Sequence, residues 1–275
     1  NCISLREISS DLDLSGATNI AGIFNGCNKL TTIPLLNTAN VQDMNSMFAN
    51  CTSLVSIPKI DTSSVVTMSN MFSGCKSLTI VPVLDMTNVT STSNMFRQCI
   101  RLENVPALVT NKVKAMNEMF KECSAIKTIP DTIKTNSANN IYAMFFGCSE
   151  LTELHEINLS NINDYFSNLH YLLEGCTSLT KVSFRGNRTN LDISNFAELS
   201  DLKIYDSLRN VTITVNNNPK MTSESLNALA EVDRGYINIS GCDGVYGCDS
   251  SIAEDKGWTV IVDYSLPHKL KKYTM

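Results

Sequence analysis

Apolar residues recur at intervals of three, four and three positions through much of the chain. In the clearest copy, Val65, Met68, Phe72 and Cys75 follow this spacing, which places four apolar side chains on one face of a helix. Ser64 stands just before them, where its side-chain oxygen can cap the free amides of a first helical turn. The pattern therefore predicts a short, capped helix, and further copies start at Val41, Val113 and Ala138.

Each apolar stripe ends on a cysteine, and a leucine or isoleucine follows three residues later. From Cys27 to Cys123 the cysteines are 24 residues apart every time. Only repeated copies of one structural unit keep such a period. We expect these thiols to form a buried structural ladder that consists of Cys27, Cys51, Cys75, Cys99, Cys123, Cys148 and Cys176.

After each cysteine the hydrophobic pattern changes, as in residues 54–58, which read Leu-Val-Ser-Ile-Pro. Such a segment predicts a very short strand that ends at its proline, because proline lacks the amide that a strand ladder needs. One repeat cannot bury its own apolar face, but a stack of repeats makes a continuous core of Leu, Ile, Met, Phe and Cys. The sequence therefore predicts an α/β repeat solenoid, a stack of short parallel strands and short helices with a period of about 24 residues. The prolines expected to align are Pro34, Pro58, Pro82, Pro106 and Pro130.

The regular pattern loosens after Pro130 and is replaced near residue 205 by a different one. We expect residues 1–204 to form the repeats and residues 205–275 to form a C-terminal cap that contains the only tryptophan, Trp258. The cap is predicted to contain strands at 211–215, 236–239 and 258–262, and helices from 222 and at 252–256. At the other end the chain starts partway through a repeat, so we expect further repeats or another chain to cover that edge.

The repeated cysteines are interpreted as reduced, buried thiols, because a cysteine in the same place in every repeat behaves as a small hydrophobe. Their spacing does not resemble that of structural zinc sites, in which ligands cluster a few residues apart. Cys242 and Cys248 lie outside the ladder, six residues apart in a glycine-rich segment. They are the one candidate disulfide of the chain, and no metal site is expected.

The distribution of charge and hydrophobicity excludes several functions. The net charge is −5, and the only basic cluster is the short segment 268–272, so a nucleic-acid partner is not expected. No apolar run approaches the roughly 20 residues of a membrane-spanning helix, so this segment is not expected to enter a membrane. The chain lacks the nucleophile, phosphate-binding and dinucleotide-binding motifs of common enzymes. We therefore expect no catalytic residues and no cofactor, and interpret His155 and His170 as solvated loop residues.

One row of residues on the predicted strand face is the candidate binding surface. These residues stand just before the isoleucine or valine of each short strand, next to the buried positions. Solenoids bind partners through such extended faces. The row consists of Thr32, Ser56, Ile80, Asn104, Thr128, Glu153 and Lys181.

The repeat unit Met-Phe-x-x-Cys-x-x-Leu-x-x-Ile-Pro, as in residues 71–82, resembles the BspA-like leucine-rich repeats. It is most similar to their Met-Phe variant, which occurs in surface proteins of mycoplasmas, Bacteroidetes and other host-associated bacteria. The resemblance covers residues 1–182 and implies a right-handed, leucine-rich-repeat-like stack. Residues 217–260 are similar to the C-terminal cap of the gut Bacteroides members. Departures are Thr92 in place of Met, Leu154-His155 in place of Ile-Pro, and Cys242-Asp243 in the glycine-rich turn.

The resemblance implies a non-enzymatic interaction or adhesion module on a bacterial cell surface or in the extracellular space. Its expected partner is a protein or glycan on a host or microbial surface, bound through the strand face. Similar repeats also occur in phages of gut bacteria, where they look like tail or virion components. A structural or receptor-binding virion role is therefore the alternative.

Overall fold

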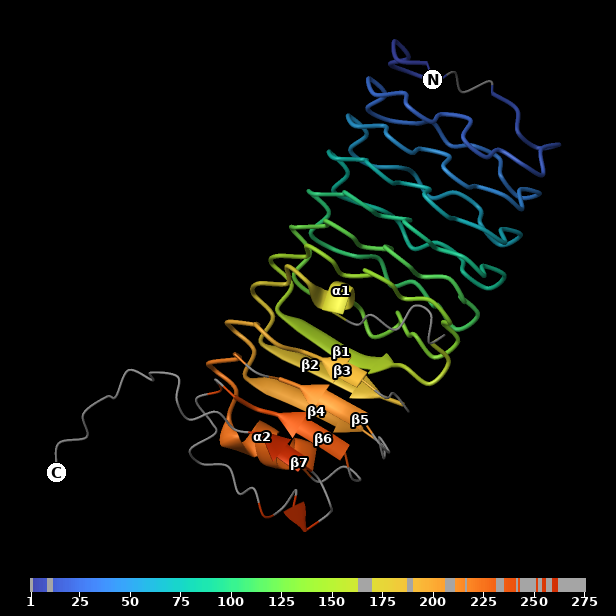
Figure 1. Ribbon diagram of the computed structural model, residues 1–275. Helices are drawn as coiled ribbons and strands as arrows, with labels where there is room; N and C mark the ends of the chain where they lie inside the picture. Colours follow the sequence, from blue (N-terminus) through green and yellow to red (C-terminus); the bar gives the residue numbers. More distant parts are fainter. Residues whose placement is uncertain are drawn as a thin grey trace. The chain divides into compact units, whose positions relative to one another are not determined.

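The computed structural model describes residues 2–8, 12–162, 170–186, 190–205, 211–215, 217–230, 235–240, 242, 251, 254–255 and 259–261. The chain divides into two compact units, residues 1–177 and 178–275. The boundary expected after residue 204 lies inside the second unit. In Figure 1 the first unit runs from blue to yellow-green as a stack of similar layers, and the second contains most of the regular strands.

Single parallel bridges join equivalent residues of successive repeats in the first unit. One column of bridges runs through Asn19, Asp43, Thr67, Ser91, Ala115 and Asn140. A second column joins Ser56 to Ile80, and Asn104 through Thr128 to Glu153. Because every bridge links residues 24 or 25 positions apart, each repeat forms one rung of a parallel stack, as the sequence period predicts.

The core of the first unit consists of identical side chains stacked from rung to rung. Six phenylalanine rings lie one above another, with centroids 5.6 to 5.8 Å apart and planes nearly parallel. The rings belong to Phe24, Phe48, Phe72, Phe96, Phe120 and Phe145. Methionines such as Met47 and Met71 fill the space beside them and are fully buried. Each such side chain contributes about 1.5–3 kcal/mol by burial, so the repeated apolar positions stabilise the stack cumulatively.

The short helices predicted in the repeats are absent from the described residues 41–51 and from their equivalents in the rungs up to residue 148, where overlapping turns replace them. In the second rung the amides of Met44, Ser46, Phe48 and Asn50 donate to carbonyls of the next rung. The amides of Met47, Ala49 and Cys51 donate to the residue three positions before. An α-helix needs every amide to reach the carbonyl four residues earlier. Since alternate amides point to the neighbouring rung, no helix can form there, and the prediction was wrong.

Backbone conformation confirms this arrangement. Ser46 and Asn50 have φ values of 55° and 60°, in the left-handed region that a right-handed helix excludes. A turn with a positive φ at its third residue favours glycine or asparagine there. The residue before each ladder cysteine is Gly26, Asn50, Gly74, Gln98, Glu122, Gly147 or Gly175, and all seven have positive φ. The recurrent glycine before cysteine is thus the sequence signal that distinguishes these turns from a helix.

Proline determines where the single bridges give way to a regular strand. Rungs with a proline after the isoleucine or valine are joined on that side by at most one bridge, such as Ser56 to Ile80. At the equivalent place His155 replaces proline, and there the first regular strand occurs, β1 (Glu153–Asn158). Proline has no amide to donate, so its replacement lets the strand lengthen. A four-residue helix, α1 (His170–Leu173), precedes Cys176 in the last rung of this unit.

Two groups of parallel strands form the second unit (Figure 1). Strand β2 (Lys181–Arg185) pairs with β4 (Asp201–Tyr205) in register. Strands β3 (Asn190–Asp192), β5 (Val211–Thr214), β6 (Gly235–Asn238) and β7 (Thr259–Ile261) form a sheet in that order. The strands predicted at 211–215, 236–239 and 258–262 are confirmed by β5, β6 and β7, whereas Trp258 lies outside the described residues.

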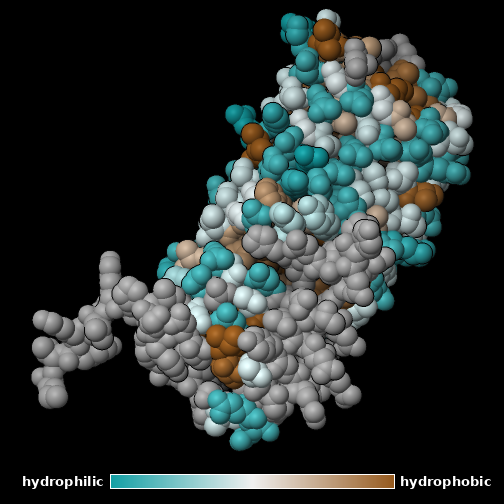
Figure 2. Space-filling model, viewed as in Figure 1, coloured by the Kyte–Doolittle hydropathy of each residue, from teal (hydrophilic) through white to brown (hydrophobic). Residues whose placement is uncertain are grey.

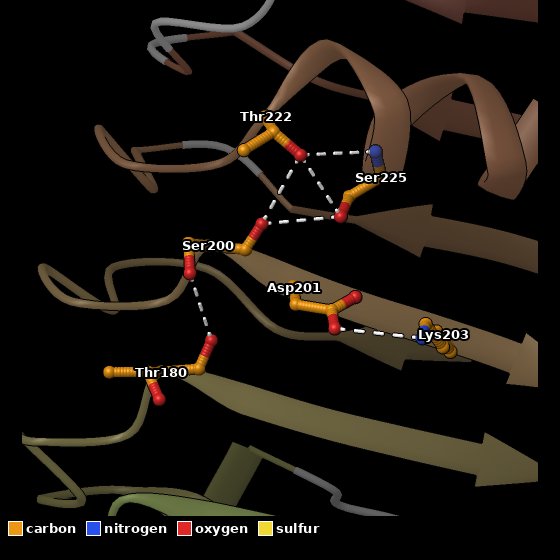
Figure 3. Close-up of polar contacts among 6 residues, drawn as sticks. All are labelled: Thr180, Ser200, Asp201, Lys203, Thr222 and Ser225. Carbon is orange, nitrogen blue, oxygen red and sulfur yellow. Dashed lines mark hydrogen bonds and ion pairs between the residues drawn. The ribbon is translucent and has the colours of Figure 1, made fainter.

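The helix predicted from residue 222 is confirmed as α2 (Ser223–Ala230). The Thr222 hydroxyl caps it by accepting a hydrogen bond from the Ser225 amide, at 3.2 Å. Figure 3 shows that the hydroxyls of Thr222 and Ser225 both donate to the carbonyl of Ser200. The hydroxyl of Ser200 in turn donates to the Thr180 carbonyl. These bonds hold the start of α2 against the residue before β4. The helix predicted at 252–256 lies largely outside the described residues.

Candidate functional site

The candidate row lies where the sequence places it, along the second column of bridges. The parallel bridges bring together Ser56 with Ile80, and Thr128 with both Asn104 and Glu153. Thr32, Ile80, Asn104 and Thr128 are exposed, and Ser56 and Glu153 are half-buried. Lys181 begins β2 in the second unit and is exposed. Whether the row binds a ligand stays a prediction.

Large apolar side chains gather around the centre of this row. Ile80 is 65 % exposed, and Val83, three residues on, is 59 % exposed. Val55, in the preceding rung, is 45 % exposed, and its carbonyl accepts the Thr79 amide beside Ile80. Figure 2 shows separate apolar patches on a mainly hydrophilic surface. The face therefore has an apolar centre, while Asn104, Thr128 and Glu153 continue it as a polar strip.

The cysteine ladder is confirmed as buried, and it also has a hydrogen-bonding function that the sequence did not reveal. From Cys51 onward, each thiol of the ladder donates to the carbonyl of the phenylalanine in the preceding rung, as Cys51 does to Phe24 at 3.1 Å and Cys123 to Phe96 at 2.8 Å. The same bond is made by Cys75, Cys99, Cys148 and Cys176. Burial raises the pKa of Cys51 and Cys176 to about 12, so these thiols stay protonated and unreactive at neutral pH.

Cys242 occupies a place similar to that of the ladder cysteines. It is fully buried, and its thiol donates to the Val215 carbonyl at 3.0 Å. The two residues are 27 positions apart, as are Cys51 and Phe24. Cys248 lies outside the described residues. The disulfide between Cys242 and Cys248 therefore stays a prediction.

Buried threonines form a second ladder that the sequence analysis missed. The hydroxyl of Thr62 donates to the Asp85 carbonyl at 3.0 Å and accepts the Asp85 amide at 2.7 Å. Thr135 makes the same pair of bonds to Asn158. Each hydroxyl thus links two rungs while its methyl group packs in the core. The signal was the recurrence of threonine at one or two repeat periods, at Thr38, Thr62, Thr110 and Thr135, with Met86 at the intervening position.

Side-chain hydroxyls and amides also lie along the first column of bridges, next to Thr67, Ser91 and Asn140. Ser69 and Ser91 share a hydrogen bond of 2.7 Å between their hydroxyls, and Ser93 donates to the side-chain carbonyl of Asn117 at 2.7 Å. Asn140 continues the chain of contacts to Asn117. These groups satisfy one another, so they stabilise the stack and are poorly suited to recognise a ligand.

Among the described residues, His155 is not part of a concentrated reactive site. His155 lies 3.7 Å from the Asp131 carboxylate, and both side chains are largely exposed. They border a shallow depression that also includes Lys134 and Glu156. The side chain of His170 lies outside the described residues. Within the described ranges, no group of three histidine, cysteine or acidic side chains is placed to hold a metal ion.

One protein family matches the chain, described as "Mycoplasma protein of unknown function, DUF285". The matches cover residues 3–101 and 79–184. The chain belongs to this family. Two overlapping matches of one family fit a chain whose rungs repeat every 24 residues, and the DUF285 region includes the whole stacked unit and the start of β2. No curated protein matches the chain.

The described part of this DUF285 chain has no helix long and apolar enough to cross a membrane.

Proposed function

We propose that this chain is a BspA-like, leucine-rich-type solenoid that acts as a non-enzymatic interaction module on a bacterial surface. The observation that carries the proposal is the contrast between the row and its neighbours. Leu54, Leu78, Ile57 and Val81 keep the flanking positions apolar and buried, whereas Ser56 and Ile80 between them differ in chemistry. Surface chemistry can therefore vary from rung to rung without changing the core, as recognition by a repeat stack requires.

The partner we propose is a protein or glycan on a host or microbial cell, bound through the strand face. The exposed apolar centre at Ile80 and Val83 is the kind of surface that marks protein interaction sites. The buried, protonated thiols leave the ladder cysteines without a nucleophilic role, which favours binding over catalysis.

Adherence of protein-coated beads to host epithelial cells and to host-associated bacteria tests the binding face. The Ile80→Glu variant should lower adherence, because it places a charge at the apolar centre of the row. The matched control is Val66→Glu, whose valine is 43 % exposed but adjoins the other column of bridges. If Ile80→Glu adheres as well as Val66→Glu, binding through the strand face is excluded. If the unchanged chain adheres to neither cell type, the adhesive role is excluded.

A virion component of a phage of gut bacteria is the second candidate, because similar repeats occur there. Intact mass and peptide mapping of native material separate the two. A cleaved export signal or a lipidated cysteine before Asn1 would support surface display. A longer, unprocessed chain that co-purifies with phage particles would support the virion role.

A further inference from the structure

A depression interrupts the strand face of the first unit between two neighbouring rungs. In the four preceding rungs the buried residues on either side of the proline are three positions apart, as are Val105 and Leu108. Ile129 and Ile133 are four positions apart, so their rung carries one extra residue. The Ile133 amide donates to the Pro130 carbonyl at 3.0 Å and closes a turn around the extra residue. The regular packing of one rung on the next is thus interrupted here.

The depression has an apolar floor and is small. The floor consists of the buried side chains of Ile129, Ile133, Met144, Phe145, Leu154 and Ile157. The cavity volume is about 20 Å³, and a single water molecule needs roughly 10–15 Å³ on the same scale. A methyl group fits such a space, whereas the side chain of leucine or phenylalanine is too large. An apolar group that enters the cavity leaves water, which favours binding.

Polar side chains line the same depression and include both hydrogen-bond donors and acceptors. Asp131 and His155 are exposed and lie 3.7 Å apart, which is too far for a hydrogen bond between them. The Asp131 carboxylate therefore keeps lone pairs for a ligand. Lys134 is half-buried and contributes an ammonium, and Glu156 completes the polar lining. Two acidic and two basic residues balance one another, so the site favours a neutral group that both donates and accepts.

The acetamido group of an N-acetylated amino sugar matches these features. Its methyl group fits the apolar cavity, its N–H can donate to the Asp131 carboxylate, and its carbonyl can accept from Lys134. The adjoining strip of the strand face is polar and uncharged at Asn104 and Thr128, which suits the hydroxyl groups of sugar rings. We propose that the depression binds the N-acetylated amino sugars of a cell-surface glycan. The inference rests on the proposed interaction role and names the glycan class for this part of the strand face.

Saturation-transfer NMR of the full chain with N-acetylglucosamine and N-acetylgalactosamine tests the proposal. The acetyl methyl protons should receive the strongest saturation, because they lie deepest in the protein. Glucose and galactose are the matched controls and should give no signal. If neither acetylated sugar gives a signal, or if glucose and galactose give equal ones, the proposal is wrong.

Variants at the polar lining test the assigned acceptor. Asp131→Ala should weaken binding about tenfold, because the sugar N–H loses a charged acceptor, and Asp131→Asn should restore part of the affinity through its side-chain oxygen. The matched control is Glu103→Ala, because Glu103 is an exposed acid of the preceding rung that does not line the depression. Equal affinity of Asp131→Ala and Glu103→Ala would overturn the assignment.

Deletion of Thr132 tests the cavity itself. It restores the three-residue spacing of the preceding rungs, so it should close the cavity and abolish binding. Circular dichroism checks that the deletion variant is folded, and unchanged binding by the folded variant would contradict the proposal. An acetylated lysine side chain offers the same acetamido group on a protein. A stronger signal from N-acetyl-lysine than from either acetylated sugar would therefore overturn the proposal in favour of a modified protein.

Failure of this inference is distinguishable from failure of the interaction role. If neither acetylated sugar binds while the beads still adhere to cells through the Ile80 face, the amino-sugar proposal is wrong and the interaction role stands. If an acetylated sugar binds and Asp131→Ala weakens its binding, the proposal is supported whatever the Ile80→Glu variant does to adherence.

Discussion

The thiol of Cys75 donates a hydrogen bond to the carbonyl oxygen of Phe48, 3.1 Å away in the preceding rung. The same carbonyl accepts the amide of Cys51 at 3.0 Å. A carbonyl oxygen has two lone pairs, and a buried one is stabilised when both have partners. The cysteine therefore does more than fill space, because its sulfur supplies the second hydrogen bond to the Phe48 carbonyl and joins two adjacent rungs.

Replacement of Cys75 by alanine should destabilise the stack by about 1–3 kcal/mol, since it removes buried volume and the second donor to Phe48. Urea unfolding followed by circular dichroism measures the effect. The control is Cys2→Ala, because Cys2 is exposed. The Cys75→Val variant restores volume without a donor. If it is as stable as the unchanged chain, the hydrogen bond contributes nothing and the thiol is only a packing group.

Stability should fall as the pH rises above about 9. Burial raises the pKa of Cys51, Cys123 and Cys176 to about 12, whereas an unfolded thiol ionises near 8.5. Between these values the unfolded chain releases protons that the folded chain retains, so the free energy of unfolding decreases with pH. Below about pH 8 both states hold the protons, and these thiols give no pH dependence.

Urea midpoints measured from about pH 7 to pH 11 test this, with Cys51→Val as the comparison. The variant should show a shallower decline, because one fewer thiol titrates on unfolding. Thiol labelling with peptide mapping gives an independent measurement. Cys2 should react in the native protein, and Cys51 should react only after unfolding. Rapid native labelling of Cys51 would contradict the buried, raised-pKa assignment.

Much of the first unit could be predicted from the sequence because its rungs repeat one register. The interval between cysteines determines which residues stack, and the apolar positions then determine the core. Phe72 and Cys75 were placed correctly inside, and Ser56 and Ile80 were placed side by side on the strand face. Parallel stacking of equivalent residues is a consequence of the period alone, so these features did not depend on the conformation of each segment.

The local conformation could not be predicted from the same pattern. Val65, Met68 and Phe72 would share one side of a helix, but a run of turns also directs them inward. The two arrangements differ in where the amides donate, which depends on the neighbouring rung. Likewise, the spacing of Cys242 could not predict its hydrogen bond to the carbonyl of Val215, 27 residues away in sequence.

Substitution of Gly175 by alanine should destabilise the end of the first unit by about 1–3 kcal/mol. Gly175 has a φ of 82°, and an added Cβ would lie 3.1 Å from the Cα of Gly147, a backbone atom that cannot rotate away. The matched control is Gly16→Ala, because nothing lies within 4 Å of that position. Thermal unfolding of the two variants compares them. A similar midpoint for both would show that the left-handed position before Cys176 tolerates a side chain.

Asn218 should be among the most sensitive polar residues of the second unit. Its buried side-chain amide donates to the carbonyls of Ile193 and Val215 at 2.7 and 2.8 Å. Its side-chain carbonyl accepts the Phe196 amide at 2.7 Å. Replacement by alanine leaves these three backbone groups without that partner, and each unsatisfied buried group costs about 1–3 kcal/mol.

We therefore expect Asn218→Ala to unfold the second unit at markedly lower urea concentration, while the first unit keeps its own transition. The neighbouring Asn217→Gly is the control. Asn217 is exposed, its side-chain amide donates to the side chain of Asn195, and glycine adopts its φ of 59° without strain. Amide hydrogen exchange in β5 and β6 localises the effect, since faster exchange should appear there and not at Phe72 or Cys75. If exchange in β5 and β6 is unchanged in Asn218→Ala, the three bonds do not stabilise this sheet.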